Sequence, residues 1–345
     1  MSITWKRSVL TEIEGLYCLE IFHTESGLKI AAASETHQGL CKMIDFDTGK
    51  EEIVWTGPGG CMNVAQWNEK GDIIAVQNFY KGGQAQEARV AAATRTGEGW
   101  QTRALAGFPF LHRCGVVQVA GESYVIASTL CTERKFAGDW SHPGKIHIFK
   151  VPKEGAEAEV HVIREGVVKN HGFWQGTLDG EPVTLVSGTE LYCVRPPRET
   201  DGSWEVTTLF SREIGDVAVQ DVDGDGKDEF FVFEGLHGNE ASVYKRAGET
   251  WEKLYSCPMK FAHAIWGGTL LGKPSFVAGS MEGEKELYLL QTDCEGGQLR
   301  FERTVLETGI GPSNCRGLVY KGKSYILAAA REAGQLVMYE LEESE

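Results

Sequence analysis

The sequence has no hydrophobic run that approaches the about 18 residues of a membrane-spanning helix, and its start, MSITWKRSVL, lacks the apolar core of a signal peptide. Basic residues are in the minority, with 34 Lys and Arg against 49 Asp and Glu and a formal net charge of −15. Nucleic acids and anionic membrane surfaces are bound through basic patches. This charge therefore argues against both as partners.

The nine cysteines contain no CxxC pair, and their number is odd. Without a secretory signal, this usage predicts reduced thiols, most of them buried as small hydrophobic side chains, in a cytoplasmic protein. The sequence also has no GxSxG, no P-loop and no GxGxxG after a strand. It gives no support to a hydrolase, a nucleoside triphosphatase or a dinucleotide-binding enzyme.

No segment shows a convincing amphipathic helix, and short β-rich runs recur about every 45–50 residues instead. The second strand of each repeat is the clearest: LKIAAAS, DIIAVQN, SYVIAST, PVTLVSG, EFFVFEG, PSFVAGS and SYILAAA. These runs are rich in β-branched and small apolar residues and are bounded by Gly or charge. Seven repeats of four strands predict an all-β fold, a seven-bladed β-propeller.

The last repeat has only three strands and finishes at QLVMYEL (335–341), while ITWKRSVL (3–10) resembles the outer strands of the other repeats. We expect this N-terminal strand to complete the last blade and close the ring, because closure removes an open sheet edge. The prediction is a single domain, residues 1–345, with blades at approximately 14–57, 58–107, 108–166, 167–212, 213–257, 258–308 and 309–345 plus 2–10.

Two inner strands contain the same sequence motif: HGFWQGTLDGEP (171–182) and HAIWGGTLLGKP (263–274) are identical at seven aligned positions. Aligning all seven inner strands gives one residue per blade: Cys18, Asn63, His112, His171, Asp216, His263 and Asn314. Inner strands line the channel of a propeller, so the three histidines and Asp216 are predicted to bind a divalent metal (Mn, Mg, Zn, Fe or Co). The alternative is polar residues that only hydrogen-bond channel water.

The loops between second and third strands should open on the same face as these histidines. They carry polar and aromatic side chains: Lys135, Trp140 and His142 in blade three, His237 in blade five, Arg331 and Glu332 in blade seven, and Tyr80 in blade two. Loop charges are often merely solvated. As a set, however, they predict a polar rim suited to a small, hydroxyl-rich ligand such as a sugar, and Asn63 and Asn314 could hydrogen-bond it.

The segment DVDGDGKDE (221–229) has carboxylates at its first, third and fifth positions and Gly at the sixth, as calcium-binding loops do. Asp221, Asp223, Asp225 and Glu229 are the candidate ligands of a structural calcium ion, on the face opposite the histidines. A plain acidic turn is the alternative.

Several short motifs together resemble one family: FLHRC (110–114), DWSHPGKIHIF (139–149), NHGFW (170–174), DVDGDGKDE, the HGN of blade five and HAIWGG (263–268). They look like the propeller domain of aldos-2-ulose dehydratase (1,5-anhydrofructose dehydratase) and related stand-alone bacterial propellers. The blade-five hairpin also resembles the FG-GAP repeat. The resemblance implies a metal-dependent carbon–oxygen lyase that eliminates water or another β-leaving group from a keto-sugar. The cupin-type domains of the fungal enzyme are absent, so a following isomerisation is not implied.

Elimination beside a ketone needs stabilisation of an enediolate-like charge, a base for the carbon-bound proton and an acid for the leaving oxygen. We assign His112, His171, His263 and Asp216 to the metal. His142, His237 and Lys135 are the base or acid candidates, and Arg331 orients the substrate. Asn63, Tyr80, Trp140, Asn314 and Glu332 are the substrate-binding candidates.

Two other functions remain open. A lyase acting on uronate oligosaccharides would need more Arg and Lys at the channel mouth than the sequence places there. A non-enzymatic propeller that binds a ligand or a protein would have no reason to collect histidines centrally. The expected partner is a small carbohydrate substrate.

Overall fold

The computed structural model describes residues 2–80, 84–248, 250–295 and 298–344. Every regular element in these ranges is a β-strand, and the strands form seven antiparallel sheets, six of four strands and one of five. The all-β, seven-bladed β-propeller is thereby confirmed. Within the same ranges no helix is long and apolar enough to cross a membrane.

The chain divides into two compact units. The four-blade unit comprises residues 13–177 and 181–212, and the three-blade unit comprises residues 1–12, 178–180 and 213–345.

The four-blade unit contains sheets one to four. Sheet one is β2 (Leu16–Thr24), β3 (Gly27–Ser34), β4 (Cys41–Asp45) and β5 (Glu51–Trp55). Sheet two is β6 (Val64–Gln66), β7 (Ile73–Gln77), β8 (Arg89–Thr96) and β9 (Gly99–Gly107). Sheet three is β10 (Leu111–Val119), β11 (Glu122–Thr129), β12 (Cys131–Glu133), β13 (His142–Lys150) and β14 (His161–Val167). Sheet four is β15 (Phe173–Leu178), β16 (Glu181–Ser187), β17 (Leu191–Arg195) and β18 (Glu205–Phe210).

The three-blade unit contains sheets five to seven. Sheet five is β19 (Ile214–Gln220), β20 (Glu229–Glu234), β21 (Glu240–Ala247) and β22 (Thr250–Pro258). Sheet six is β23 (Ala262–Leu270), β24 (Lys273–Ser280), β25 (Leu287–Glu295) and β26 (Gln298–Glu307). Sheet seven is β27 (Pro312–Tyr320), β28 (Lys323–Ala330), β29 (Gln335–Ser344) and the N-terminal strand β1 (Ser2–Glu12).

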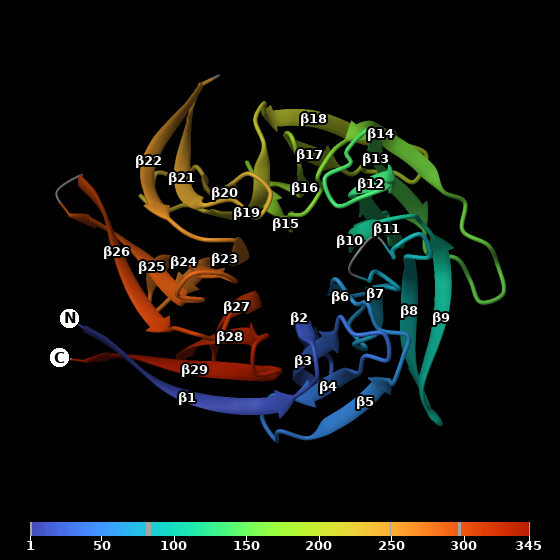
Figure 1. Ribbon diagram of the computed structural model, residues 1–345, viewed down its shortest axis with the longest axis horizontal. Helices are drawn as coiled ribbons and strands as arrows, with labels where there is room; N and C mark the ends of the chain where they lie inside the picture. The colour runs from blue at the N-terminus through green and yellow to red at the C-terminus, as the bar shows by residue number, and fades with distance from the viewer. Residues whose placement is uncertain (1, 81–83, 249, 296–297, 345) are drawn as a thin grey trace. The chain divides into compact units, whose positions relative to one another are not determined.

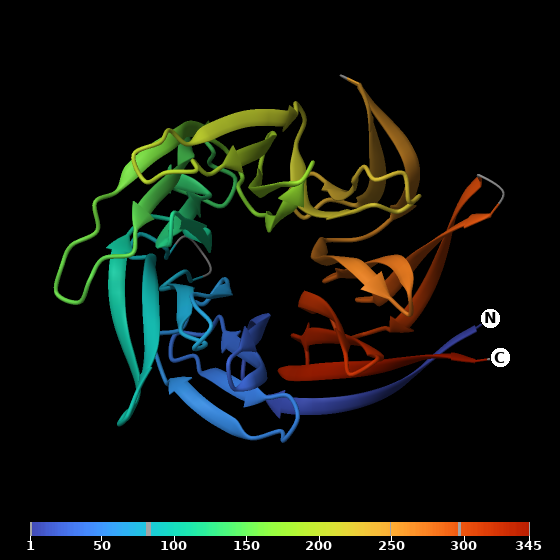
Figure 2. The same ribbon diagram turned by 180° about the vertical axis from the view of Figure 1, so that it is seen from behind.

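The N-terminal strand completes sheet seven, as predicted. β1 pairs antiparallel with β29 from Ser2↔Ser344 to Glu12↔Gln335, and both views of the ribbon show the blue and red strands side by side with the two termini together (Figures 1 and 2). An ion pair of 2.8 Å between Arg7 Nε and Glu307 Oε2 ties β1 to β26. The last strand of the chain therefore has no open edge.

The hydrophobic cores lie between successive sheets. Phe231 and Phe233 of sheet five pack with Phe276 and Tyr288 of sheet six, and the rings of Phe231 and Phe276 stack with centroids 4.8 Å apart. All four side chains are at most 1% exposed. Burying an aromatic or aliphatic side chain of this size stabilises the fold by about 1.5–3 kcal/mol, so these layers hold neighbouring sheets face to face.

The repeated sequence motif of sheets four and six (171–182 and 263–274) also contains residues that are required for packing. Each tryptophan lies over the glycine two residues later: a Cβ on Gly176 would meet Trp174 at 2.3 Å, and one on Gly268 would meet Trp266 at 2.4 Å. The spacing Trp-x-Gly is therefore required by close packing, because any larger residue would collide with the indole. The histidine takes no part in this contact. Its presence at the start of both segments therefore has another cause.

Candidate metal centre

His112 and His263 lie at irregular points where inner strands begin, and His171 lies two residues before β15. In sheet three Leu111 pairs with Thr129 and Arg113 with Ser128, so His112 is an extra residue in the ladder. In sheet six the same shift falls between Ala262 and Ala264, around His263. A β-bulge of this kind re-aims a side chain out of the regular alternation, and bulges are common beside functional sites.

The ladder register also corrects the alignment made from the sequence. In sheet one the extra residue is Tyr17, so the alignment of Cys18 with the histidines is wrong by one position. The irregular segments of sheets five and seven each span two residues, and Asp216 and Asn314 are the second of the two. His112 and His263 therefore share a position that Asp216 does not share.

In the four-blade unit, His112 and His171 form a buried pair of imidazoles. They are 4% and 2% exposed, and their ring centroids are 4.8 Å apart with an interplanar angle of 36°. The ring of Phe79 meets His112 edge-on at 5.2 Å. Two predicted metal ligands are thus neighbours in a largely dry environment, where neutral imidazole can act as a ligand.

Arg113 follows His112 and is a site residue that the sequence analysis missed. It is only 7% exposed, and it donates from Nε to the carbonyl of His171 at 2.7 Å and from Nη1 to the carbonyl of Met62 at 2.6 Å. One guanidinium therefore links the inner strand of sheet three to the chain segments that begin sheets two and four. Its contacts also hold the backbone at His171.

In the three-blade unit, a backbone contact sets the tautomer of His263. Its Nδ1 lies 2.7 Å from the carbonyl oxygen of Ser313, and the side chain is 4% exposed. A carbonyl oxygen can only accept, so Nδ1 carries the proton and the neutral ring presents the lone pair of Nε2. Metal-binding histidines are usually oriented by such a contact from the second nitrogen.

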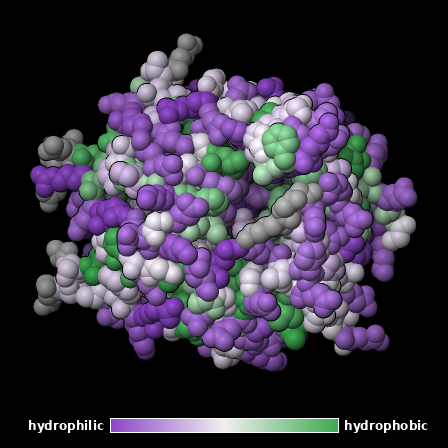
Figure 3. Space-filling model, in the orientation of Figure 1, coloured by the Kyte–Doolittle hydropathy of each residue, from purple (hydrophilic) through white to green (hydrophobic). Residues whose placement is uncertain are grey.

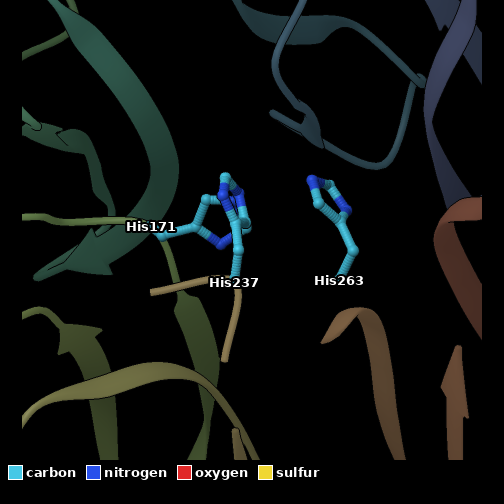
Figure 4. A group of neighbouring side chains, drawn as sticks. All are labelled: His171, His237 and His263. Atoms are coloured by element: carbon cyan, nitrogen blue, oxygen red, sulfur yellow. The ribbon is translucent and has the colours of Figure 1, made fainter. Parts of the chain in front are cut away.

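His237 lies beside His263 in the same unit. It sits in the turn after β20 with a φ of 48°, a left-handed conformation that is uncommon for a residue with a side chain. Its ring stacks on Phe261, with centroids 4.1 Å apart, and lies 5.4 Å from that of His263 at an interplanar angle of 17°. The sequence analysis gave His237 an acid or base role, whereas this position also suits a metal ligand. Figure 4 shows the imidazoles of His237 and His263, together with that of His171.

Two of the other polar residues predicted for the inner strands, Asp216 and Asn63, are hydrogen-bonded to backbone groups. Asp216 is 7% exposed and its Oδ1 accepts from the amide of Val217 at 2.9 Å. Asn63 donates from Nδ2 to the carbonyl of Cys114 at 2.6 Å and accepts from the amide of Cys114 at 3.0 Å. The amide of Asn63 is thus engaged in joining sheet two to sheet three, which argues against its predicted substrate contact.

The predicted rim residues of the four-blade unit lie apart from the histidine pair. Lys135 and His142 are exposed, and the described residues give neither of them a hydrogen bond, ion pair or ring contact with His112 or His171. Trp140 packs under the guanidinium of Arg134, whose Cζ is 4.9 Å from the ring.

Tyr80, in the loop after β7, belongs to a separate aromatic contact. Its ring stacks on His37 with centroids 3.9 Å apart, and its hydroxyl donates to Asn78 Oδ1 at 3.1 Å. This stack offers a flat aromatic face of the kind that carbohydrate rings pack against. The substrate role of Tyr80 stays a prediction.

The rim residues of sheet seven also have partners in their own unit. Glu332 forms an ion pair with Lys285 at 3.1 Å, with both side chains well exposed. Asn314 Oδ1 accepts from Arg316 Nη1 at 3.4 Å. Arg331 directly follows β28 and opens the turn that leads to β29. Their substrate roles remain predictions.

The candidate calcium loop already contains a cation. Lys245 Nζ lies 2.5 Å from Asp223, 2.8 Å from Asp225 and 3.3 Å from Glu229, so it contacts three of the four predicted ligands. Burial raises the pKa of Glu229, while the hydrogen bond from Lys245 lowers the pKa of Asp225. A calcium ion would have to displace this ammonium group, and the structural calcium therefore stays a prediction.

Asp221, the fourth predicted ligand, instead shapes the loop. Its two carboxylate oxygens accept from the amides of Gly224 at 2.7 Å and Gly226 at 2.9 Å. Both glycines have positive φ values, of 75° and 81°. The glycines that suit a calcium-binding loop therefore also suit a turn that is closed by hydrogen bonds to the Asp221 side chain.

All nine cysteines are free thiols, eight of them buried, as their usage predicted. Burial raises the pKa of Cys114 to about 12, and burial likewise raises the pKa of Cys315 to about 12. These thiols near the inner strands are therefore protonated at neutral pH, so they are poor metal ligands.

No family model matches the chain, and no curated protein matches it. Among solved structures, the chain is similar to one described as the crystal structure of BBS1N in complex with ARL6DN, soaked with mercury. The TM-score is 0.58 at 13% sequence identity, and the match covers 99% of this chain and 97% of that chain. At this identity the likeness supports the propeller fold alone, and the resemblance to aldos-2-ulose dehydratase stays a prediction.

Proposed function

We propose that this protein is a divalent-metal-dependent carbon–oxygen lyase that acts on a keto-sugar or a 3-keto-glycoside. The observation that carries the proposal is a pair of adjacent imidazoles in each unit: the buried His112 and His171 in one, and in the other the buried His263 with the half-buried His237 from the turn after β20. A scaffold needs no such pairs, because buried polar groups are costly unless they are satisfied.

The proposed metal ligands are His171, His237 and His263 (Figure 4), which together offer three ring nitrogens. The support from the fold is general: the inner strands of a β-propeller surround a central channel, so residues that begin these strands face a common axis. The Nε2 lone pair of His263 fits the set, because Ser313 accepts the proton of Nδ1. Three neutral nitrogens are the usual protein ligands of a catalytic metal with open positions.

The metal would act as a Lewis acid that stabilises negative charge on the substrate oxygen beside the carbon that loses its proton. His112 would take that proton, since its ring lies against that of His171 and is almost fully buried. Asp216 and Arg331 would orient the substrate. Lys135 and His142 are both exposed. Either would protonate the leaving oxygen only if the loop of sheet three that carries them closes over the ligand.

The test is a screen of 3-keto-glycosides and anhydro-keto-sugars, followed by the ultraviolet absorbance of the enone product. The metal-loaded protein should give product, and His171→Ala should lose both the metal and turnover. His161→Ala is the matched control, because His161 lies on an outer strand with 58% of its side chain exposed. Full activity in metal-free protein would refute the proposal.

A second candidate function is protein binding, because the similar solved structure holds BBS1N together with ARL6DN. Against it, hydrophilic residues cover most of the face seen in Figure 3, and the hydrophobic ones form small separate patches. The most exposed large hydrophobic side chain among the described residues is Phe136, at 68%. Absence of bound metal together with capture of a partner through this loop would favour the second function.

A further inference from the structure

Arg113 is a buried cation of the four-blade unit. With 7% of its surface exposed, it makes two hydrogen bonds, both to backbone carbonyls, and these leave three of the about five N–H groups of a guanidinium unused. Among the residues that the structure describes, no carboxylate lies within 4.0 Å of Arg113, and it makes no other hydrogen bond or ion pair. A buried charge is costly without a counter-charge, and carbonyl dipoles supply only part of one.

The nearest candidate for an anion within the protein is the thiol of Cys114, the next residue. Burial raises the pKa of Cys114 to about 12, and the opposing effects of Asn63 and Arg113 are smaller. The thiol is therefore neutral at physiological pH. Within 4.0 Å, no described side chain therefore supplies a counter-charge to Arg113.

The location of Arg113 also favours an anionic ligand. Arg113 contacts the backbone of His171 and follows His112 directly, so its guanidinium is a neighbour of two residues of the proposed site. A guanidinium binds planar oxyanions through paired N–H groups, and its single charge is matched by a monoanion. Because only 7% of Arg113 is exposed, a ligand would have to reach it with one end group.

We propose that Arg113 binds the carboxylate of an acidic sugar, so that the substrate of the proposed lyase is a sugar carboxylate. The assignment of a substrate rests on the proposed lyase function. The binding of a carboxylate by Arg113 does not depend on that function. It also supplies the cationic side chain that the sequence analysis did not find for a uronate substrate.

The experiment measures anion binding separately from metal and activity. Protein stripped with a chelator is titrated at constant ionic strength with D-glucuronate, D-glucose, acetate and inorganic phosphate, by calorimetry and by the shift in Tm. Glucuronate and acetate should bind and glucose should not. In Arg113→Gln the affinity for glucuronate should fall by at least about tenfold, the loss expected for a charge-assisted hydrogen bond.

Arg103→Gln is the matched control, because Arg103 also donates to a backbone carbonyl, that of Pro152 at 2.7 Å, but lies on β9. If Arg113→Gln does not fold, Arg113→Lys is used in its place. The order of affinities of the four ligands for the wild-type protein also tests the proposal without any variant. Equal binding of glucose and glucuronate, undiminished binding in the variant, or preference for phosphate would overturn the proposal. Glucuronate binding by a protein that takes up no ion when it is incubated with each candidate metal would leave this inference standing and refute the lyase proposal.

Discussion

The Nδ1 atom of His263, which begins sheet six, lies 2.7 Å from the carbonyl oxygen of Ser313, which begins sheet seven. This contact joins two neighbouring inner strands of the three-blade unit and fixes which nitrogen bears the proton. It also orients the ring so that Nε2 carries the lone pair.

We predict that His263 keeps the Nδ1–H tautomer over the pH range in which it is neutral. Nitrogen-15 chemical shifts of histidine-labelled protein should show this tautomer, with His263→Ala identifying the signal. An Nε2–H tautomer for this residue would contradict the assigned ligand atom.

We predict that Asn63→Ala lowers stability rather than substrate affinity. The variant leaves both the amide and the carbonyl of Cys114 without their partner, and an unsatisfied buried group of this type costs about 1–3 kcal/mol. Urea denaturation measures the loss. Gln118→Ala is the control, since Gln118 is exposed and bonds only to Ser123, and it should change stability by less than about 0.5 kcal/mol. Unchanged stability in Asn63→Ala would refute the structural role.

We predict that stability falls in mild acid because of His147. Burial lowers its pKa to about 4 from an ordinary value of 6.5, so between these values the unfolded chain binds a proton that the folded chain does not. The stability is fully present above pH 6.5, is lost as the pH falls through this window, and levels off below pH 4. At about 1.4 kcal/mol per pH unit, the change over this window is about 3 kcal/mol.

Denaturation midpoints measured from pH 7 to pH 4 should therefore have a smaller slope in His147→Gln than in wild type. His161→Gln provides the control, because its side chain is 58% exposed, and its slope should match wild type. A slope in His147→Gln equal to that of wild type would show that other groups cause the acid sensitivity.

We predict that Lys245, rather than calcium, neutralises the acidic loop of sheet five. Lys245→Met should cost about 3 kcal/mol, because it strips the buried Glu229 of its counter-charge. Millimolar calcium should restore Tm in this variant and change it little in wild type. Lys253→Met is the control, since Lys253 contacts Glu234 and Glu240 outside the loop. A strong effect of calcium on wild type would instead support the calcium site.

The fold could be predicted because the pattern that specifies it is local. Each second strand, such as SYILAAA at 324–330, marks its own sheet, and the unmatched strand at 3–10 indicated the closure that β1 makes with β29. The three histidines were found because they recur at the same place in a repeated strand.

What could not be predicted depends on register and on contacts distant in sequence. The bulge that makes Tyr17 the extra residue of sheet one leaves no mark in the sequence. Lys245 lies directly across from Glu229 on the adjacent strand, a pairing that only the ladder reveals. Arg113 reaches carbonyls 51 and 58 residues away, and carbonyl acceptors carry no sequence signal at all.

The central claim is that imidazoles from different blades hold one divalent ion, and its most direct test is the metal content of the protein by inductively coupled plasma mass spectrometry. Wild type and His161→Ala should each contain about one ion per chain after dialysis, and His171→Ala and His263→Ala should each contain almost none. Wild-type protein that holds no ion after incubation with each candidate metal, or variants that hold as much as wild type, would contradict the account.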